Sequence, residues 1–275
     1  MPYSPELAEC FLDDGTFDMK IENTKEVNFK PKEARLKQDE IPIMDGILDT
    51  WIKADIIERC NADEPCFGYV IPHLVHTPGD KTRLTFDCRH INQFFAPPPV
   101  DIPRPMVGLL LLNKDSKLFK IDITEAFNHI KLSPKLQKFF HFQVNGIRYR
   151  SKRMGFGWSM APAIFQTLMK AILKRIHQLF GVLGEVMFDD CLFSRSNLNQ
   201  ETIDKVVKFF TQIGFEINLK KSILSPSEEI DWMKFHYNRH GVALSNEAYA
   251  SYMKLKDLYL NNSTVGHALR LLGFL

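Results

Sequence analysis

The sequence predicts an α+β fold, because three kinds of local signal mix along it without a regular strand–helix–strand repeat. The first is a set of short β-rich runs joined by turn signals. The second is a set of helices with apolar stripes, and the third is an acidic pair between two apolar runs. Of the 275 residues, 45% are hydrophobic and 25% are charged, which excludes a disordered chain. The formal net charge of +2 leaves the class of partner open.

The first hundred residues combine one helix with one hairpin. Residues 1–30 show little periodicity, so we expect a loosely attached lead-in. Apolar residues between positions 43 and 57 recur at helical spacing. The β-rich runs 68–75 and 83–87 flank Pro78-Gly79-Asp80, which predicts a hairpin. Five prolines between positions 96 and 105 predict an extended connector, because proline does not fit inside a helix or a central strand.

The remaining sequence alternates short strands with longer helices. Asn145-Gly146 predicts a hairpin turn, and Ala161-Pro162 opens a helix with proline in its first turn. The other expected elements are a short helix at 109–112, a strand at 117–121 ending at Asp122, a helical turn at 124–128, a helix at 202–213 closed by Gly214, and strands at 215–218 and 230–237.

Several classes of protein are disfavoured by simple counts. No apolar run approaches the roughly 18 residues of a membrane span, and the first residues lack the pattern of a secretory signal. Five cysteines at irregular spacing favour a reducing compartment over a disulfide scaffold. The spacing of Cys60, Cys66, His73 and His76 fits no common zinc signature, so we expect buried or strand-borne side chains there.

Carboxylates at the ends of apolar runs are the most unusual feature. Asp189 and Asp190 can converge only at a tight turn, and Asp122 closes another expected strand. A turn residue or a helix cap is the ordinary alternative for each aspartate. Three neighbouring carboxylates would repel one another, whereas divalent cations remove that repulsion and clamp oxygens during phosphoryl transfer. The residues alone therefore indicate a two-metal site.

Four segments in register resemble the polymerase motifs of a reverse transcriptase, most similar to the gypsy-type long-terminal-repeat retrotransposon and retroviral group. They are TRLTFDCRHIN at 82–92, LFKIDITEAFNHIKL at 118–132, MGFGWSMAPAIFQTLM at 154–169 and MFDDCLF at 187–193. Residues 32–60 resemble the lead into the fingers of this group. Leu219-Lys220-Lys221 and Trp232-Met233 resemble its two later palm motifs.

The resemblance implies a right-hand polymerase fold with an antiparallel palm sheet. It places the lead-in at 1–30, the fingers at 31–96 and 132–154, the palm at 97–131 and 155–240, and the start of a thumb at 241–275. The implied activity is RNA-directed DNA synthesis from deoxynucleoside triphosphates onto a primer 3′-hydroxyl, with an RNA or DNA template–primer as partner. We also expect an intracellular, cytoplasmic location, which includes a location within a virus-like particle. We expect the chain to be part of a larger polyprotein, and whether it forms a homo-oligomer is left open.

Carried over by position, the resemblance assigns the metal ligands. Asp122 and Asp189 are the principal ligands, Asp190 has a less direct role, and the backbone carbonyl of Ile123 adds an oxygen. Two Mg²⁺ ions are implied, with Mn²⁺ as the substitute. Two rival functions are an RNA-dependent RNA polymerase and a non-catalytic, domesticated palm that binds nucleic acid. The intact carboxylates disfavour the second rival.

Two groups of basic residues match positions that handle the triphosphate. Arg83 matches the fingers arginine that grips it, because a guanidinium binds phosphate bidentately. Lys81 is a candidate for the partner lysine on the same hairpin. Lys220 or Lys221 stands where the family has a lysine proposed to protonate the departing pyrophosphate. Solvated surface cations are the alternative for all of them.

The sugar of the incoming nucleotide is assigned to aromatic residues and a glycine. Phe127 matches the aromatic that crowds a 2′-hydroxyl, which favours deoxynucleotides and disfavours the RNA polymerase rival. Core packing is its alternative. Phe156 stands where retroviral enzymes carry glutamine and retrotransposon relatives often carry phenylalanine. Gly157 allows close backbone approach to the nucleotide.

The expected contacts with template and primer come from two more sets of residues. Trp158 is expected to touch the template, and Met187 replaces the usual tyrosine of the acidic motif, which could alter primer positioning. A basic cluster suits a nucleic-acid track, with a solvated strand face as its alternative: Arg148, Arg150, Lys152 and Arg153. Asp87, Arg89 and Asn92 match a fingers signature that we interpret as mainly structural, with Asp87 and Arg89 paired.

Overall fold

The computed structural model describes residues 5–19, 21, 27–76, 82–104, 111–112 and 115–261. The chain divides into two compact units, and each is described by itself. Unit 1 comprises Met1–Asp101 and Glu125–Met169, and unit 2 comprises Ile102–Thr124 and Lys170–Leu275. This division does not test the predicted boundaries of fingers, palm and thumb, which therefore stay a prediction.

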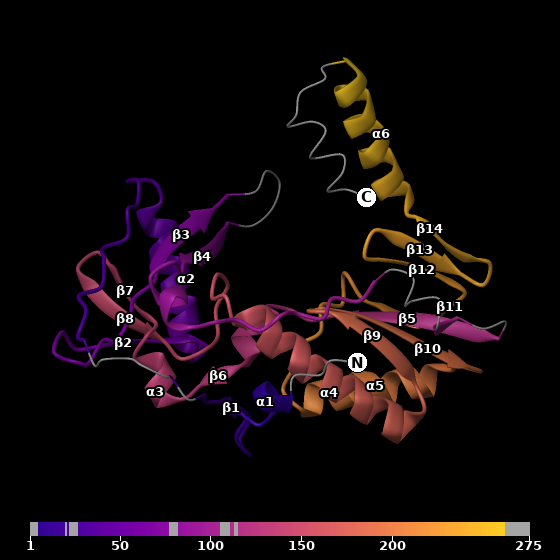
Figure 1. Cartoon of the computed structure of the whole chain (residues 1–275), viewed down its shortest axis with the longest axis horizontal. Coiled ribbons are helices and arrows are strands. Elements are labelled where there is room, and N and C mark those ends of the chain that lie inside the picture. Colours follow the sequence, from indigo (N-terminus) through magenta and orange to yellow (C-terminus); the bar gives the residue numbers. More distant parts are fainter. Residues whose placement is uncertain are drawn as a thin grey trace. The chain divides into compact units, whose positions relative to one another are not determined.

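Unit 1 contains short strands, two longer helices and several single turns (Figure 1). In chain order its elements are α1 Pro5–Ala8, β1 Thr16–Phe17, α2 Ile41–Lys53, β2 Ile57–Arg59, β3 Ile71–Val75, β4 Arg83–Asp87, the 3₁₀ turns η1 Ile91–Phe94 and η3 Ala126–His129, β6 Lys131–Leu132, α3 Pro134–Gln137, β7 His141–Val144, β8 Ile147–Ser151 and the first half of α4 Ala161–Phe180.

Two antiparallel hairpins in unit 1 follow the sequence signals. The strands β3 and β4 pair along their whole length, and residues 77–81 between them lie outside the described residues. The strands β7 and β8 meet at Asn145 and Gly146, whose φ angles are +50° and +74°. Two successive positive φ angles define the hairpin turn for which Asn-Gly is preferred. With β2 on the other side of β8, this hairpin forms a three-stranded sheet.

The expectation of a loosely attached lead-in is wrong for the described part of residues 1–30. Strand β1 pairs in parallel with β6, which lies more than a hundred residues later. Phe17 is fully buried, and its ring makes edge contacts with Phe11 and Trp158. The Ser133 hydroxyl donates a 2.6 Å hydrogen bond to Asp18. The segment is therefore part of the core of unit 1, because aromatic burial stabilises it.

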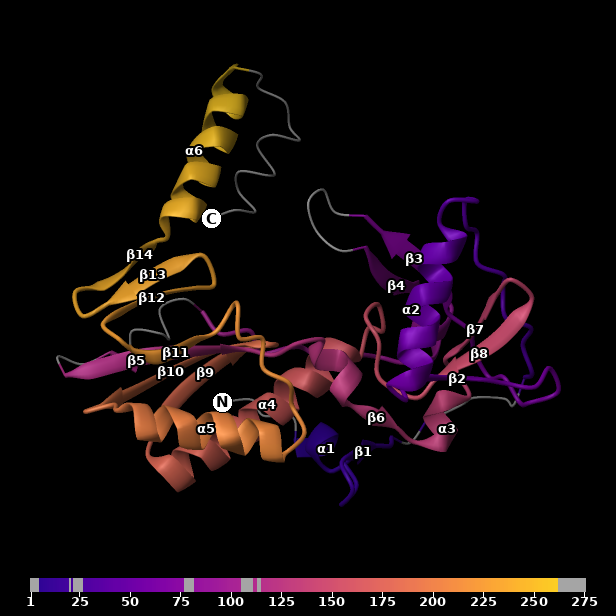
Figure 2. The ribbon, with the colours of Figure 1, turned by 180° about the vertical axis from the view of Figure 1, so that it is seen from behind.

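Unit 2 is built on a four-stranded antiparallel sheet in the order β11-β5-β10-β9 (Figures 1 and 2). A second antiparallel sheet has the order β12-β13-β14 and is followed by a helix. The elements are β5 Ser116–Asp122, the second half of α4, β9 Leu183–Met187, β10 Asp190–Ser196, α5 Gln200–Gln212, β11 Ile223–Ser227, β12 Glu229–Trp232, β13 Phe235–Asn238, β14 Gly241–Leu244 and α6 Asn246–Asn261.

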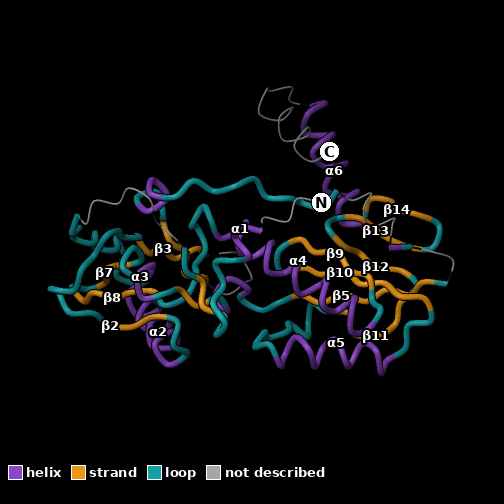
Figure 3. Tube along the Cα trace, turned by 60° about the horizontal axis from the view of Figure 1, so that its bottom comes forward, coloured by secondary structure: helices purple, strands orange, loops and turns teal. Residues whose placement is uncertain are grey.

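Different elements pack on the two faces of the large sheet, which Figure 3 shows in a tilted view. On one face Phe119 and Phe193 stack at 4.7 Å, and Phe193 contacts Phe210 of α5. On the other face Leu118 and Leu192 pack with the aromatic residues of the small sheet. Because neighbouring strand residues point to opposite faces, Lys120 and Asp122 share the side of Leu118.

Several expected elements differ in detail from the structure. Residues 215–218 form no strand beyond a single bridge between Ile217 and Ile123. The expected strand at 230–237 is a hairpin, because Met233 and Lys234 adopt positive φ angles and turn the chain between β12 and β13. Helix α2 ends at Lys53, followed by Asp55 at φ +57°. The short helix expected at 109–112 lies largely outside the described residues.

Within the described ranges, none of the helices combines the length and the apolar character that crossing a membrane requires.

Candidate active site

The three aspartates singled out in the sequence meet at one end of the large sheet of unit 2. Asp122 is the last residue of β5, and Asp190 is the first residue of β10. The two residues are direct partners in the antiparallel register. Directly opposed residues have their Cβ atoms about 5 Å apart, so the carboxylates of Asp122 and Asp190 lie side by side on one face.

Asp189 lies in the two-residue loop that joins β9 to β10. The register pairs Met187 with Asp190, which leaves Phe188 and Asp189 as the loop. Phe188 has a φ of +55°, a conformation that glycine usually supplies at the first position of such a turn. The backbone carbonyl of Asp189 accepts a 2.9 Å hydrogen bond from the Ile123 N–H, which ties the loop to the end of β5. The tight turn expected from the sequence is confirmed.

Burial and mutual repulsion both disfavour the charged form of these carboxyl groups. Burial raises the pKa of Asp190 to about 6, and the charges of Asp122 and Asp189 add to the rise. The pKa of Asp122 is also raised, first by burial and then by Asp189. Asp190 Oδ1 is buried and has no hydrogen-bond partner among the residues that the structure describes. The cluster therefore carries more negative charge than its surroundings compensate.

Two lysines moderate this charge. Lys120 Nζ lies 3.9 Å from Asp190 Oδ1, and its side chain is only 18% exposed. Lys221 Nζ lies 4.0 Å from Asp122 Oδ2, and its side chain is 62% exposed. Both distances are at the outer limit of an ion pair, so neither lysine makes a close hydrogen bond with its carboxylate. Lys120 was missed in the sequence, although its position two residues before Asp122 on a strand gives it the same face.

The segment after α5 holds Asp122 in place through the backbone. The Asn218 N–H donates a 2.8 Å hydrogen bond to the Asp122 carbonyl, and the Asp122 N–H donates one of 2.9 Å to the Ser222 hydroxyl. Ile123, buried beside them, pairs with Ile217. Lys220 lies in the same turn, where its N–H donates to the Asn218 side chain. The lysine pair predicted from the sequence is thus anchored next to one catalytic candidate, and Lys221 is the member that approaches it.

The chemistry of this donor set fits divalent cations. The buried, unpartnered oxygen of Asp190 and the adjacent Asp122 offer the oxygen ligands that such ions prefer. Nowhere in the described ranges do three or more His, Cys, Asp or Glu side chains form a ready-made metal cage. A bound ion would take its remaining ligands from water or substrate phosphate, the usual arrangement for Mg²⁺.

The residues expected to bind the sugar lie in unit 1. Phe127 is half-buried in η3, and its ring meets the ring of Phe156 at 4.7 Å and 67° and that of Phe165 at 5.5 Å. Phe156 is 50% exposed. Gly157 has a φ of +98°, and a Cβ there would lie 2.3 Å from the carbonyl oxygen of Phe86. The close backbone approach expected of Gly157 is therefore one toward strand β4 of the same unit.

Of the two fingers residues expected to bind the triphosphate, one lies within the described part of the chain. Arg83 is exposed at the first position of β4. Lys81 lies outside the described residues. Asp87, the last residue of β4, and Arg89, in the turn that follows, form the expected pair, with Arg89 Nε 2.9 Å from both carboxylate oxygens. This pairing lowers the pKa of Asp87 to about 2. The expected pairing of Asp87 with Arg89 is confirmed, and its structural role stays a prediction.

The expected template contact of Trp158 does not agree with its surroundings. Its side chain is 1% exposed, and its ring packs against Phe17, Phe95 and Phe140. An indole enclosed by three aromatic rings belongs to the core of unit 1 and leaves no surface for a template.

Met187, by contrast, is half-buried and packs against the apolar cluster between the two sheets of unit 2. Its effect on primer positioning stays a prediction.

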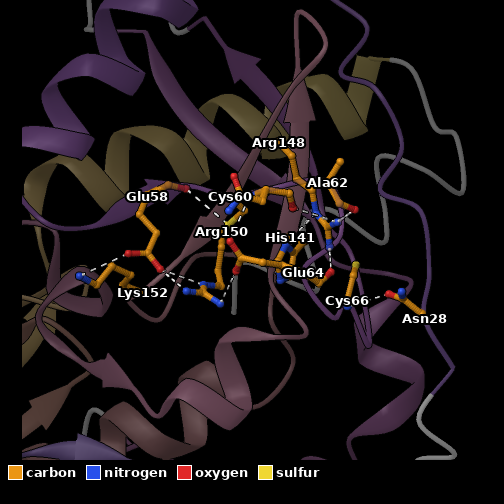
Figure 4. A network of polar contacts seen from close by, with 11 residues as sticks. Asn28, Glu58, Cys60, Ala62, Glu64, Cys66, His141, Arg148, Arg150 and Lys152 are labelled. Carbon is orange, nitrogen blue, oxygen red and sulfur yellow. Dashed lines mark hydrogen bonds and ion pairs between the residues drawn. The ribbon is translucent and has the colours of Figure 1, made fainter.

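The basic cluster on and after β8 is engaged inside unit 1 (Figure 4). Arg148 donates to His141 Nδ1 at 3.1 Å and to the backbone carbonyls of Ala62 and Glu64 at 2.8 and 2.9 Å. Arg150 donates to Glu58 at 3.0 Å and to Glu64 at 3.2 Å.

The last two cations of the cluster have partners of the same kind. Lys152 pairs with Asp55 and lies 3.8 Å from Glu58. Arg153 lies 3.9 Å from Asp55 and donates to its carbonyl. The donors of this cluster already have partners within unit 1, so the cluster is not a solvated strand face. These contacts also do not favour phosphate binding, and a role in nucleic-acid binding stays a prediction.

The two cysteines considered with the histidines lie beside this cluster. The Cys60 thiol donates to the Glu58 carbonyl and the Cys66 thiol to the Gly68 carbonyl. Burial raises the pKa of both thiols, that of Cys60 to about 11. Thiols that stay protonated and donate to backbone carbonyls are unreactive.

Comparisons with known proteins agree with the geometry. Residues 75–237, more than half of the chain, match the family model "Reverse transcriptase (RNA-dependent DNA polymerase)". The Pol polyprotein of transposon 297 from Drosophila melanogaster is 28% identical over 174 residues, covering 63% of this chain and 16% of the relative. The genome polyprotein of Petunia vein clearing virus is 24% identical over 176 residues, covering 63% of this chain and 8% of the relative. The chain thus matches less than a fifth of the length of these relatives.

Solved structures of a foamy viral protease–reverse transcriptase share the fold. The complex with an RNA/DNA hybrid has a TM-score of 0.69 at 20% identity, covering 90% of this chain and 32% of that chain. The complex with double-stranded DNA has a TM-score of 0.70 at 20% identity, covering 94% and 53%. The α+β polymerase fold expected from the sequence is confirmed.

Proposed function

Because the chain belongs to the reverse transcriptase (RNA-dependent DNA polymerase) family, we propose that it forms the polymerase core of a retroelement polyprotein and carries out RNA-directed DNA synthesis. The substrates are deoxynucleoside triphosphates and an RNA or DNA template with a DNA primer. The observation that carries the proposal is the under-compensated carboxylate cluster at the end of β5 and β10, because phosphoryl transfer needs such a set of oxygen ligands.

The residues of unit 2 hold the reacting phosphate. Asp122 and Asp189 are the metal ligands in this proposal, with the Ile123 carbonyl as an additional oxygen. Asp190 stays beside Lys120, and its buried oxygen without a hydrogen-bond partner among the described residues is a less direct ligand. Bound divalent ions, Mg²⁺ or its substitute Mn²⁺, would stabilise the charge on the attacking and leaving oxygens. Lys221, exposed and already directed toward Asp122, is the better placed of the two lysines to donate a proton to the leaving pyrophosphate.

The residues of unit 1 select the nucleotide. Arg83 and Lys81 contact the triphosphate in this proposal, and Phe127 with Phe156 forms the aromatic surface for the sugar. Four residues separate Asp122 from Phe127 along the chain.

Primer extension by the purified chain tests the function. We expect a DNA primer on an RNA template to be extended with deoxynucleotides when Mg²⁺ or Mn²⁺ is present, and extension to stop when the metal is chelated. Extension with ribonucleotides in preference would instead indicate an RNA polymerase. Binding of template–primer without any extension would indicate a non-catalytic palm.

Replacement of Phe127 tests the sugar preference. We expect Phe127→Val to raise ribonucleotide incorporation relative to deoxynucleotide incorporation by about tenfold or more, because the ring would no longer crowd a 2′-hydroxyl. Single-nucleotide incorporation with each type of substrate measures the ratio. Phe142→Leu, a change at a fully buried ring of the same unit, is a control that alters packing without touching the Phe127–Phe156 pair. An unchanged ratio in Phe127→Val would contradict the assignment.

A further inference from the structure

A single side chain holds the backbone on both sides of Gly157. Asn92 lies in the 3₁₀ turn η1 after β4. Its Nδ2 donates a 3.1 Å hydrogen bond to the Gly157 carbonyl, and its Oδ1 accepts a 2.9 Å hydrogen bond from the Ser159 N–H. All three residues belong to unit 1. One planar amide therefore fixes two backbone groups that are two residues apart.

Two further contacts hold the same loop against the end of β4. The Cys88 thiol lies 3.8 Å from the Phe156 carbonyl as a weak hydrogen-bond donor. Gly157 lies so near Phe86 that no side chain would fit there. The Asn92 N–H in turn donates to the Cys88 carbonyl, which anchors the amide itself. The position of residues 156–159 is thus set from residues 86–92, more than sixty positions earlier in the chain.

The loop presents the aromatic surface assigned to the sugar. Phe156 is half exposed, and its ring stands edge-on to Phe127 at 4.7 Å. Phe156 makes this contact from a segment whose backbone is held by the Asn92 side chain at Gly157 and Ser159. A shift of the loop would therefore change the position of Phe156 and leave Phe127 in η3.

We propose that Asn92 is a positioning residue for nucleotide selection, which fixes the loop 156–159 so that Phe156 stands beside Phe127. Asn92 acts through the loop backbone. This inference rests on the proposed function and adds a residue to it.

The chemistry of the amide predicts a graded series of variants. Asn92→Ala removes both hydrogen bonds. Asn92→Asp keeps an acceptor for the Ser159 N–H but places a carboxylate against the Gly157 carbonyl, which offers no proton. Gln93→Ala is the matched control, because the Gln93 amide donates to the Arg89 carbonyl of its own turn at 3.4 Å and does not bond to the loop.

Nucleotide kinetics and hydrogen exchange together test the proposal. We expect Asn92→Ala to raise the KM for deoxynucleotides by about tenfold with a smaller change in kcat, and to lower the preference for deoxy- over ribonucleotides. Amide exchange at Ser159 should become faster in Asn92→Ala and stay slow in Asn92→Asp, whose KM should lie between those of wild type and Asn92→Ala. Gln93→Ala should behave as wild type in both measurements.

The outcomes separate the inference from the proposed function. A wild-type chain that incorporates no nucleotide overturns both. An active wild type with an Asn92→Ala variant that matches Gln93→Ala in KM and sugar preference overturns the inference alone. So does a loss confined to kcat. If Asn92→Ala does not fold, Asn92→Asp decides by the same criteria, since it keeps the bond to Ser159.

Discussion

Two clusters of charge lie in different units and are compensated to opposite degrees. In unit 2, Asp122 and Asp190 face each other with lysines no closer than 3.9 Å, and one oxygen of Asp190 has no hydrogen-bond partner within the described structure. In unit 1, Arg148 and Arg150 donate to carbonyl and carboxylate oxygens at 2.8 to 3.2 Å. The sequence had suggested a functional role for each cluster, metal binding for the acidic one and nucleic-acid binding for the basic one.

The difference indicates what each cluster is for. Polar groups that are fully paired stabilise the fold that pairs them, and an ionic network left intact has no capacity for a new ligand. Carboxyl groups whose pKa values are raised by burial and by one another are typical of sites that await a cation. We infer that the basic cluster stabilises the sheet β2-β8-β7, and that the acidic cluster is the reactive one.

Removal of a carboxylate should have the largest effect. We expect Asp122→Asn and Asp189→Asn each to lower primer extension by about 1000-fold or more, because both lose a metal ligand. Thermal stability should stay the same or rise, since the change relieves repulsion. Asp204→Asn is the control and should keep full activity, because Asp204 is exposed on α5 and accepts a hydrogen bond from Gln200 of the same helix. Activity within tenfold of wild type in either site variant would contradict the assignment of the acidic cluster.

Local signals in the sequence were enough for the acidic cluster. Asp122 and the Asp189-Asp190 pair each end or begin an apolar strand, and antiparallel pairing of those strands brings them together. The hairpins at Asn145-Gly146 and between β3 and β4 were also predicted, because their signals lie within a few residues.

Long-range pairing explains what the sequence did not reveal. The partner of Arg150, Glu58, lies 92 residues away, so the run of basic residues looked unpaired. The same holds for β1, whose partner β6 makes the lead-in part of the core. The burial of Trp158 depends on rings from three distant segments. No periodicity or turn signal carries such information.

Loss of a cation from the basic cluster should reduce stability more than nucleic-acid binding. We expect Arg150→Met to lower the free energy of unfolding by about 3 kcal/mol, because it leaves Glu64 partly buried without this ion-pair partner and Glu58 with only the longer contact to Lys152. Lys205→Met, which breaks an exposed pair with Glu201, should cost about 0.5 kcal/mol. Denaturant unfolding measures both. An Arg150→Met variant with wild-type stability and a weaker salt dependence of template binding would restore the nucleic-acid track.

The basic cluster of unit 1 should also disfavour protonation of His141, which accepts a hydrogen bond from Arg148. Burial, with Arg148 and Arg150 adding to it, lowers the pKa of His141 to about 3. Below the ordinary pKa of about 6.5 the unfolded chain takes up a proton that the folded chain does not, so stability falls as the pH falls. The loss from this group is about 2 kcal/mol at pH 5 relative to pH 7.5.

His141→Gln isolates this contribution. We expect the loss of stability between pH 7.5 and 5 to be about 2 kcal/mol smaller in His141→Gln than in wild type, measured by denaturant unfolding at each pH. Equal pH dependence in the two proteins would mean that His141 is already able to take a proton in the fold, and that the network around Arg148 is looser than its distances indicate.

The smallest effect should come from the buried cation of the acidic cluster. Lys120 lies 3.9 Å from Asp190, so in the absence of metal it moderates the repulsion among the carboxylates. We expect Lys120→Met to lower the free energy of unfolding by about 1 kcal/mol in otherwise wild-type protein, and by much less when Asp190→Asn has removed the partner charge. Unfolding of the four proteins of this cycle, with chelator present, gives the coupling directly. A coupling near zero would mean that Lys120 does not compensate Asp190, and the contrast between the two clusters would then be even larger than the structure indicates.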